Sequence, residues 1–330
     1  MEQARAGDTR LDALVRLRAP DRNSALLLVE AKRLLATRDV PAVLEQLARA
    51  RDQLRTEESA VPMLVARYLA PSTRERLEEP DAAYADATGN VWITLEKPAL
   101  FLRDVGTDRD PWRGPGRPRG TLKGPPAARV VRSLIDYAPP VTVPELVKRS
   151  RASTGATYRV VQFLGTEALI ERAQRGPIVR VDWRRLIQRW GKDYSFLRSN
   201  TTASYLAPRG FPALLDALRS VHDLRYVLTG SLAAQWFAPY APPRLAMVYV
   251  DRLQETADLL GLRRVETGAN VLLAAGDYDI VFERARERDA LRIAAPSQVA
   301  VDLITGPGRS PAEATALLDW METNETEWRL

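Results

Sequence analysis

Three residues near the start of the chain, Asp12, Glu30 and Lys32, have the types and spacing that phosphodiester hydrolysis needs. Residues 11–17 and 24–32 are apolar-rich runs separated by a turn, and we expect two paired strands there. Because side chains alternate along a strand, Glu30 and Lys32 should project from the same face, where Asp12 of the paired strand can approach them. Two carboxylates could hold a divalent metal ion, and the lysine could stabilise the attacking water or the leaving group.

The segments that follow predict the α/β elements that would position these side chains. Residues 40–54 place apolar side chains at helical spacing. Residues 61–69 and 91–95 have the β-branched and apolar composition of strands, and we expect a turn at residues 84–90 between them. The pattern therefore predicts a small α/β domain.

The Asp…Glu-x-Lys spacing in this context resembles the restriction-endonuclease-like superfamily of PD-(D/E)xK nucleases, and Gln46 matches a position where some members carry glutamine. The resemblance implies a nuclease-like fold over residues 1–106, trimmed because only 11 residues precede Asp12. If that domain is active, the resemblance implies catalysis by Asp12, Glu30 and Lys32, with Mg²⁺ held by the two carboxylates. We favour a nuclease fold that has lost its catalytic activity and serves DNA contact or dimerisation. A plain surface ion pair of Glu30 with Lys32 is the alternative.

The strongest positive charge lies between Pro111 and Lys192. This stretch holds 17 Lys and Arg residues against 5 Asp and Glu residues, a net charge of +12. The whole chain carries +6, so the remainder sums to −6. A basic block between acidic flanks indicates a nucleic-acid-binding module.

Within this block, residues 126–192 have the pattern of a winged helix-turn-helix. An apolar-periodic helix at residues 127–135 precedes a short helix at 142–149, for which Thr142 is the expected cap. A third helix should run over residues 154–167, and residues 169–181 should form a hairpin, followed by a closing helix. Duplex DNA is therefore the expected partner.

The third helix should present one face to the core and the other to DNA. Thr157, Val161 and Leu164 recur at i, i+4 and i+7 and should face inward. Hydroxyl, aromatic, arginine and glutamine side chains on the outward face suit the reading of base edges in the major groove. These outward residues are Thr154, Tyr158, Arg159 and Gln162.

Residues 107–125 form a basic Gly/Pro-rich segment. Its Gly-Arg-Pro core resembles an AT-hook, which lies in the minor groove, whereas a basic interdomain linker is the interpretation that we favour. In either case its arginines can reach the DNA backbone. The residues that we expect at phosphates or in the minor groove are Arg113, Arg117, Arg119, Lys148, Arg149, Arg151, Arg172, Arg175 and Arg180.

After a linker at residues 193–206, residues 207–330 begin with a strand that enters a Gly230-Ser231 turn and a helix. This opening resembles the nucleotidyltransferase fold, in which the next strand carries a pair of metal-binding acidic residues. The strand at residues 245–251 lacks such a pair, and Asp279 comes too late in the chain. Without two carboxylates there is nothing to hold a catalytic magnesium ion, so we expect a degenerate transferase-like domain.

The ordered series at residues 268–273, 279–283 and 295–309, together with the winged helix, resembles the AbiEi-like antitoxins of type IV toxin–antitoxin systems. Tyr249 and Gln298 are possible signature positions for packing. The resemblance implies a DNA-binding autorepressor, a toxin encoded nearby, and no catalytic residue. The resemblance covers residues from about 120 onward. The nuclease-like N-terminal domain is therefore an addition that the short members of the family lack.

Composition limits the remaining options. The chain lacks cysteine, which excludes disulfides and thiolate chemistry and fits a cytoplasmic location. The longest uncharged run, residues 226–243, contains three prolines and is a poor membrane span. We therefore expect a cytoplasmic, nucleoid-associated α/β (α+β) transcriptional regulator that acts as a repressor. It should bind duplex DNA as a homodimer, with no membrane partner and no cofactor. A metal-dependent nuclease targeted by the winged helix, which would need Mg²⁺, and a toxin-neutralising protein are the alternatives.

Overall fold

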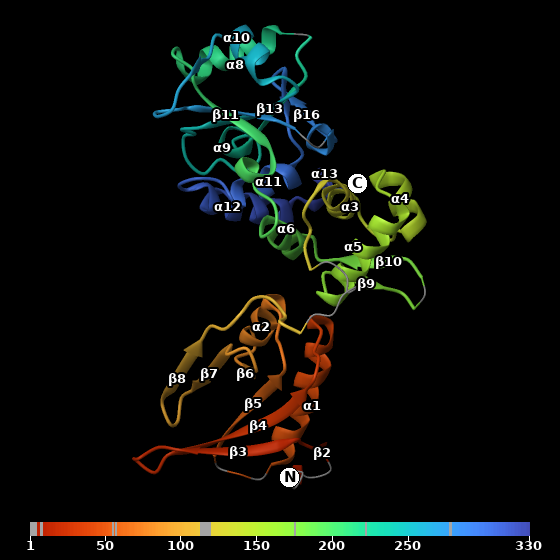
Figure 1. The fold of residues 1–330 in the computed structure, drawn as a ribbon, viewed down its shortest axis with the longest axis vertical. Coiled ribbons are helices and arrows are strands. Elements are labelled where there is room, and N and C mark those ends of the chain that lie inside the picture. Colours follow the sequence, from red (N-terminus) through yellow and green to blue (C-terminus); the bar gives the residue numbers. More distant parts are fainter. Residues whose placement is uncertain are drawn as a thin grey trace. The chain divides into compact units, whose positions relative to one another are not determined.

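The computed structural model describes residues 5–6, 9–54, 56, 58–112, 120–174, 176–221, 223–276 and 279–330, and it is a mixed α/β structure (Figure 1). Its internal contacts divide the chain into two compact units. One comprises Met1–Pro118 with Leu164–Ala168, and the other comprises Arg119–Phe163 with Leu169–Leu330. Each unit is described separately below.

The first unit is built on a six-stranded sheet in the order β3-β4-β5-β6-β7-β8. β3 pairs antiparallel with β4, whereas β4, β5 and β6 are parallel, which requires the crossovers that α1 and α2 supply. β1 and β2 form a separate antiparallel pair. The elements are β1 (Arg5–Ala6), β2 (Thr9–Arg10), β3 (Ala13–Arg18), β4 (Ser24–Lys32), η1 (Thr37–Asp39), α1 (Val40–Gln53), β5 (Ser59–Ala66), α2 (Pro71–Glu78), β6 (Ala83–Asp86), β7 (Val91–Leu95) and β8 (Leu100–Asp104).

Both faces of the central strands are buried. On one face, Leu28 and Leu64 join a cluster with Val43 and Leu47 of α1. On the other face, Leu27 of β4 belongs to a second cluster with residues of β5, β6 and β7. This burial on both sides explains why β4 is an almost continuous apolar run, as parallel strands between two layers are.

The turn expected at residues 84–90 is wrong at its start, because residues 83–86 form β6 and pair with β5. The reversal follows this strand and is organised by Asp86, which is 8% exposed. Burial alone would raise the pKa of Asp86, but hydrogen bonds from the Thr88 hydroxyl and the Asn90 side-chain amide hold it below the usual range, and the backbone N–H groups of Leu69 and Thr88 add to this effect. One buried carboxylate thus ties the end of β6 to the segment after β5.

The second unit contains a seven-stranded mixed sheet in the order β14-β11-β15-β13-β12-β17-β16 and a helical part that precedes it (Figure 1). The helical part consists of α3 (Pro125–Asp136), α4 (Val143–Ser150), α5 (Thr154–Thr166), the antiparallel strands β9 (Ile170–Arg172) and β10 (Ile178–Val181), and α6 (Trp183–Gly191). Of α5, the residues up to Phe163 belong to this unit, and the last three are grouped with the first unit. The sheet part consists of α7 (Phe196–Ser199), β11 (Thr201–Leu206), α8 (Gly210–Ser220), β12 (Tyr226–Thr229), α9 (Gly230–Ala234), β13 (Ala246–Val250), α10 (Leu253–Leu259), β14 (Arg263–Arg264), β15 (Val271–Ala275), η2 (Asp279–Phe282), β16 (Arg286–Arg288), β17 (Leu291–Ile293), α11 (Pro296–Ile304), α12 (Ser310–Thr323) and α13 (Glu325–Trp328).

The cap expected for the second helix of the basic block is confirmed. The Thr142 hydroxyl accepts a hydrogen bond from the Glu145 backbone N–H at 3.3 Å, and the Glu145 carboxylate accepts one from the Thr142 N–H at 2.8 Å. This capping box satisfies two N–H groups that α4 would otherwise leave unpaired. The expected closing helix is α6, whose Trp183 and Trp190 are buried.

A buried polar network fastens α3 to the sheet part of the second unit. Arg132 is fully buried and donates to Asp136 Oδ2 at 2.8 Å and to Gln298 Oε1 of α11 at 2.9 Å. It also donates to the backbone carbonyl of Ile280 at 3.2 Å. Every one of these bonds is shielded from water, so the guanidinium fixes α3 to α11 and to the turn η2.

The network continues through Gln298 to Asp302, which is fully buried on the same helix. Oδ1 of Asp302 accepts from the hydroxyls of Tyr194 at 3.0 Å and Tyr249 at 2.8 Å, and Oδ2 accepts from Thr229 at 2.6 Å. Burial raises the pKa of Asp302 to about 6, although these hydrogen bonds lower it in part. Tyr249 and Gln298, singled out in the sequence, therefore hold a buried carboxylate.

This carboxyl group makes stability depend on pH in a defined direction. Its usual pKa is 3.8, so between pH 4 and about 6 the folded protein retains a proton that the unfolded chain has released. Stability should therefore fall as the pH rises through this window, by up to about 3 kcal/mol from this group. Asp302→Asn should flatten that part of the profile, as measured by urea unfolding at several pH values between 4 and 7. Identical pH profiles for the two proteins would contradict the burial of an ionisable group here.

Candidate nucleic-acid interface

The helix α5 has the two faces that its sequence predicts. Thr157, Val161 and Leu164 are 0%, 2% and 0% exposed, so the predicted inward face is confirmed. Ser153 precedes the helix, and its side-chain oxygen accepts a hydrogen bond from the Ala156 N–H at 3.3 Å. The predicted outward residues are all exposed. They are Thr154, Tyr158, Arg159 and Gln162.

The C-terminal end of α4 brings three cationic side chains to the turn before α5. Lys148, Arg149 and Arg151 are all exposed. The Arg149 guanidinium stacks 4.3 Å from the centroid of the Tyr137 ring, which restricts its position. Within the described residues, Lys148, Arg151 and Arg159 form no ion pair. Their charges are therefore available to an anionic partner.

The hairpin β9–β10 carries two of the predicted arginines. Arg172 donates to the Gly176 carbonyl at 3.2 Å, within the turn of the hairpin. Arg180 lies 3.1 Å from Glu171, and both side chains are mostly exposed, so this ion pair is weak and can exchange partners. Four of the predicted residues lie outside the described part of the chain. They are Arg113, Arg117, Arg119 and Arg175.

Several cations of the basic block are already neutralised by acidic partners. Arg132 pairs with Asp136, and Arg189 pairs with Asp193 at 2.7 Å. Arg184 donates to Glu322 at 2.9 Å and also contacts Asp319. The net charge of the sequence block thus overstates the charge that is free to meet phosphates, and the free cations concentrate around α4 and α5.

The turn between α4 and α5 forces Arg151 into the left-handed region, at φ +53°. An L side chain there costs roughly 1–2 kcal/mol. Arg151→Gly should therefore stabilise the protein by about 0.5–1 kcal/mol, because part of the gain is lost to the greater freedom of glycine in the unfolded chain. Thermal unfolding would measure it. Lys148→Gly, in the last turn of the same helix, should destabilise by about 1 kcal/mol, and a rise in Tm there would contradict this account.

The residues named for phosphodiester chemistry converge in the first unit. Glu30 is 5% exposed, and its two carboxylate oxygens contact Lys32 Nζ and, at 3.3 Å, Gln46 Nε2 of α1. The Asp12 carboxylate accepts from the backbone N–H of Ala31 at 2.8 Å. The structure thus brings Asp12 to the end of β4 that bears Glu30 and Lys32. Among the described residues no group of three or more His, Cys, Asp or Glu side chains could hold a metal ion.

The strand–Gly-Ser–helix opening of the sheet part is present as β12, Gly230-Ser231 and α9. Gly230 has φ +65°, and a Cβ there would collide with Met247 on β13. Asp251 follows β13, and both Asp251 and Asp279 contact Arg225, at 3.5 and 3.2 Å. A guanidinium therefore neutralises these two carboxylates.

No family model, no curated protein and no solved structure matches this chain. In the described part of the chain, no helix is long and apolar enough to cross a membrane.

Proposed function

We propose that this chain is a sequence-specific duplex-DNA-binding regulator in which α5 reads base edges. The exposed row Thr154, Tyr158, Arg159 and Gln162, on a helix whose opposite face is buried, is the observation that carries the proposal. Arginine pairs in bidentate fashion with guanine and glutamine with adenine in the major groove. Such side chains must stand on a rigid element, and the burial of Thr157, Val161 and Leu164 supplies that rigidity.

The surrounding elements support a winged helix-turn-helix arrangement. α4 and α5 are joined by a short turn, and α3 packs beside α4. Val141, between α3 and α4, bridges Ile178 of β10 through two backbone hydrogen bonds of 3.0 and 2.8 Å, which ties the hairpin to the helices. With α5 in the major groove, the hairpin would be the wing that meets the adjacent backbone.

Salt dependence and a matched variant test this proposal. If about five phosphates are neutralised, log K should fall against log salt with a slope of about −4 to −5. Arg159→Ala combined with Lys148→Ala should weaken binding, as measured by fluorescence anisotropy on a selected duplex. Arg264→Ala, which removes an exposed arginine from β14, is the control and should bind as the wild type does. Salt-independent affinity, or equal loss in the control, would overturn the proposal.

The resemblance to AbiEi-like antitoxins supports a repressor role in the cytoplasm, close to the nucleoid. In such a regulator, residues 207–330 would form a degenerate nucleotidyltransferase-like domain without catalysis, since Arg225 already neutralises Asp251 and Asp279. Neutralisation of a toxin by this domain is the further alternative. Co-purification of the native protein with a nucleotidyltransferase-like partner supports that role, whereas purification as a single species opposes it.

A second candidate function, metal-dependent DNA cleavage, is favoured by the convergence of Glu30, Lys32, Gln46 and Asp12 in a restriction-endonuclease-like arrangement. Magnesium often binds through one or two carboxylates and water, so Asp12 and Glu30 are a sufficient donor set. A divalent ion bound there would activate water for attack on a phosphodiester. Cleavage that requires Mg²⁺ or Mn²⁺ and disappears in Glu30→Ala and in Lys32→Ala would establish this function. The absence of cleavage on duplex, single-stranded and branched DNA would exclude this function.

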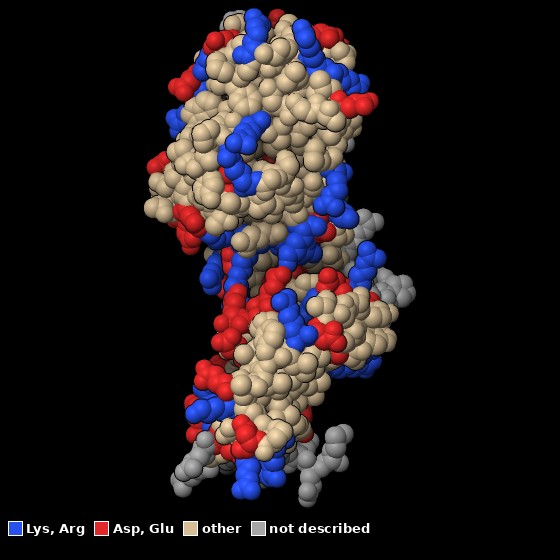
Figure 2. All heavy atoms as spheres, turned by 90° about the vertical axis from the view of Figure 1, so that its left-hand side faces the viewer, with Lys and Arg blue, Asp and Glu red and all other residues tan. Residues whose placement is uncertain are grey.

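We further propose that the chain pairs as a dimer through β8, an edge strand of the six-stranded sheet. All five residues of β8 are exposed, and Phe101 and Leu102 are 64% and 46% exposed. The described strands pair β8 with β7 alone, so its outer edge is open. On the side of the first unit where β8 lies, Figure 2 shows a mainly uncharged surface. An open apolar edge of this kind is a template for another strand.

A second copy of β8 fits this edge better in one register than in another. Opposite residues in an antiparallel pair point to the same face. A twofold axis at Arg103 would place two arginines opposite each other, whereas an axis at Leu102 places Arg103 opposite Phe101 of the partner. The second register is therefore favoured, and it matches the symmetry of a palindromic DNA site.

Leu102→Lys should abolish this pairing, because the substitution places two ammonium groups opposite each other at the axis. Light scattering after gel filtration should show a dimer for the wild type and a monomer for the variant at micromolar concentration. Leu14→Lys, on the opposite edge strand β3, is the control and should remain dimeric. A monomeric wild type, or a dimeric Leu102→Lys protein, would contradict the assignment.

A further inference from the structure

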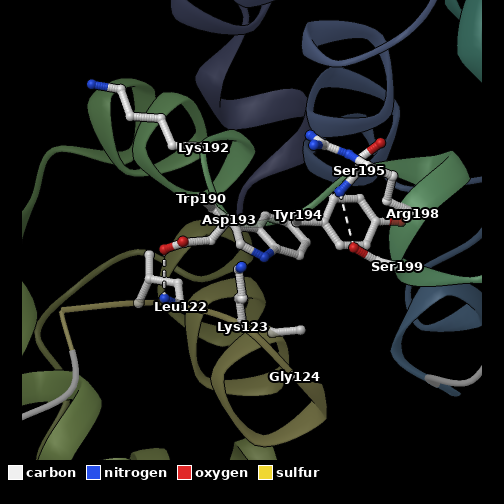
Figure 3. A pocket seen from close by; sticks show the side chains of 11 residues that line it. Leu122, Lys123, Gly124, Trp190, Lys192, Asp193, Tyr194, Ser195, Arg198 and Ser199 are labelled. Carbon is white, nitrogen blue, oxygen red and sulfur yellow. Dashed lines mark hydrogen bonds between the residues drawn. The ribbon is translucent and has the colours of Figure 1, made fainter. Parts of the chain in front are cut away.

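A cavity in the second unit lies where α3 begins and where α6 leads into α7 (Figure 3). Its volume is about 340 Å³, within the range of small-molecule sites. Leu122, Lys123 and Gly124 come from the segment that directly precedes α3, and Trp190 and Tyr194 come from the end of α6 and the segment after it. No part of the proposed DNA-reading row belongs to its lining.

The charge of the cavity is positive. Lys123, Lys192 and Arg198 line it, with Asp193 as the acidic lining residue. The Asp193 carboxylate is already engaged, because Oδ2 accepts from Arg189 Nη1 and from the Leu122 backbone N–H, both at 2.7 Å. Within the described residues, the side chains of Lys123 and Arg198 have neither an ion pair nor a hydrogen bond. The cavity therefore presents uncompensated positive charge.

Aromatic rings and backbone geometry complete the lining. The rings of Trp190 and Tyr194 lie 5.0 Å apart at 32° to each other, and Figure 3 shows them between Lys123 and Arg198. Gly124 precedes α3 at φ +89°, a conformation that L side chains rarely adopt. Ser199 also lines the cavity, and its hydroxyl accepts from the Ser195 N–H at 3.0 Å. A hydroxyl, cations and apolar ring surface together suit an anion that carries an organic group.

We propose that this cavity binds a small phosphorylated molecule and that its occupancy changes DNA affinity; the second half rests on the proposed function. A phosphoryl group would accept from Lys123 and Arg198, while the organic part lies against Trp190 and Tyr194. The walls belong to both the helical and the sheet parts of the second unit. A ligand that bridges these walls biases the position of the helical part, which carries α5, relative to the sheet part.

Calorimetric titration of the full-length, DNA-free protein tests the binding site. Inorganic pyrophosphate and a nucleoside monophosphate are the probes, at about 0.15 M salt, and the second should bind more tightly because it also contacts the rings. Lys123→Ala with Arg198→Ala should weaken both by about ten-fold or more, since charge-assisted hydrogen bonds are lost. Arg263→Ala with Arg264→Ala, which removes two exposed arginines from β14, is the charge-matched control and should leave binding unchanged. No heat of binding at millimolar probe, or equal affinity in the double variant, overturns the proposal.

A second experiment, which measures DNA binding, distinguishes a failure of this inference from a failure of the proposed function. Anisotropy with duplex DNA alone reports whether the chain binds DNA, whatever the cavity does. The nucleoside monophosphate should shift that affinity in the wild type and leave it unshifted in the double variant. If the double variant instead loses DNA affinity without any ligand, and pyrophosphate competes with DNA, then the cavity receives a DNA phosphate and the ligand proposal fails.

Discussion

Arg132→Ala should destabilise the second unit by about 3–5 kcal/mol, the largest effect expected of any single substitution in the chain. Arg132 is fully buried and joins Asp136, Gln298 and the Ile280 carbonyl. Removing the guanidinium leaves the Asp136 carboxylate buried, with Ser297 as its remaining side-chain hydrogen-bond donor among the described residues. Urea unfolding followed by tryptophan fluorescence would measure the loss, since Trp183, Trp190 and Trp328 are buried in this unit.

Arg184→Ala is the matched control for this substitution. It also removes an arginine that pairs with two carboxylates, Asp319 and Glu322, but these partners are more than 60% exposed. Exposed pairs contribute about 0–1 kcal/mol, so the control should unfold almost as the wild type does. Similar losses for Arg132→Ala and Arg184→Ala would contradict the role assigned to burial.

Arg159→Ala should weaken binding to the preferred duplex by about 1–3 kcal/mol, roughly 5- to 150-fold, and should relax the base preference at one position. The physical reason is that a bidentate arginine contact discriminates one base pair from the others. Lys148→Ala should instead weaken binding about equally on all sequences and reduce the salt slope by about 1, since a phosphate contact carries no sequence information.

Anisotropy on the preferred duplex, on single-base variants of it and across a salt series measures both effects. Arg159→Lys sharpens the comparison, because it keeps the charge and loses the planar fork. It should retain the salt slope and lose the base preference. A loss that is uniform over all sequences in Arg159→Ala would remove Arg159 from the base-reading row and assign it to the backbone.

The local patterns of the helical part were predictable from sequence because their causes are local. The α4 cap depends on Thr142 and Glu145, three residues apart, and the two faces of α5 follow from apolar spacing along one helix. The predicted turn at residues 84–90 includes most of β6, because this short strand lies just before the Thr88-Gly89-Asn90 reversal. In such a short strand, pairing with β5 decides the conformation, and that pairing is not local.

The buried charges could not be predicted in the same way. An arginine or aspartate in a helix is usually exposed, so the burial of Arg132 and Asp302 does not follow from their residue types. Their burial depends on Gln298, 166 residues from Arg132, and on Thr229, 73 residues from Asp302. By contrast, Arg189 of α6 and Asp193, two residues past the end of that helix, pair across an i, i+4 spacing, which is a local relation.

Part of the candidate interface was therefore predicted correctly, and part needed the structure. The outward row of α5 was predicted from periodicity. The sequence did not show which cations remain unpaired, because the partners of Arg184, Asp319 and Glu322, lie more than 130 residues away in the chain. The cavity beside Trp190 was also invisible in sequence, since Lys123 and Arg198 are brought together only by folding.

The central claim, that α5 reads duplex DNA, is tested most directly by sequencing the genomic fragments that the purified protein retains at about 0.15 M salt. The wild type should retain a limited set that shares a short motif. Tyr158→Ala with Arg159→Ala, two exposed positions that should not disturb folding, should lose that set. Retention of fragments without a shared motif by the wild type, or an unchanged set in the double variant, would contradict the claim.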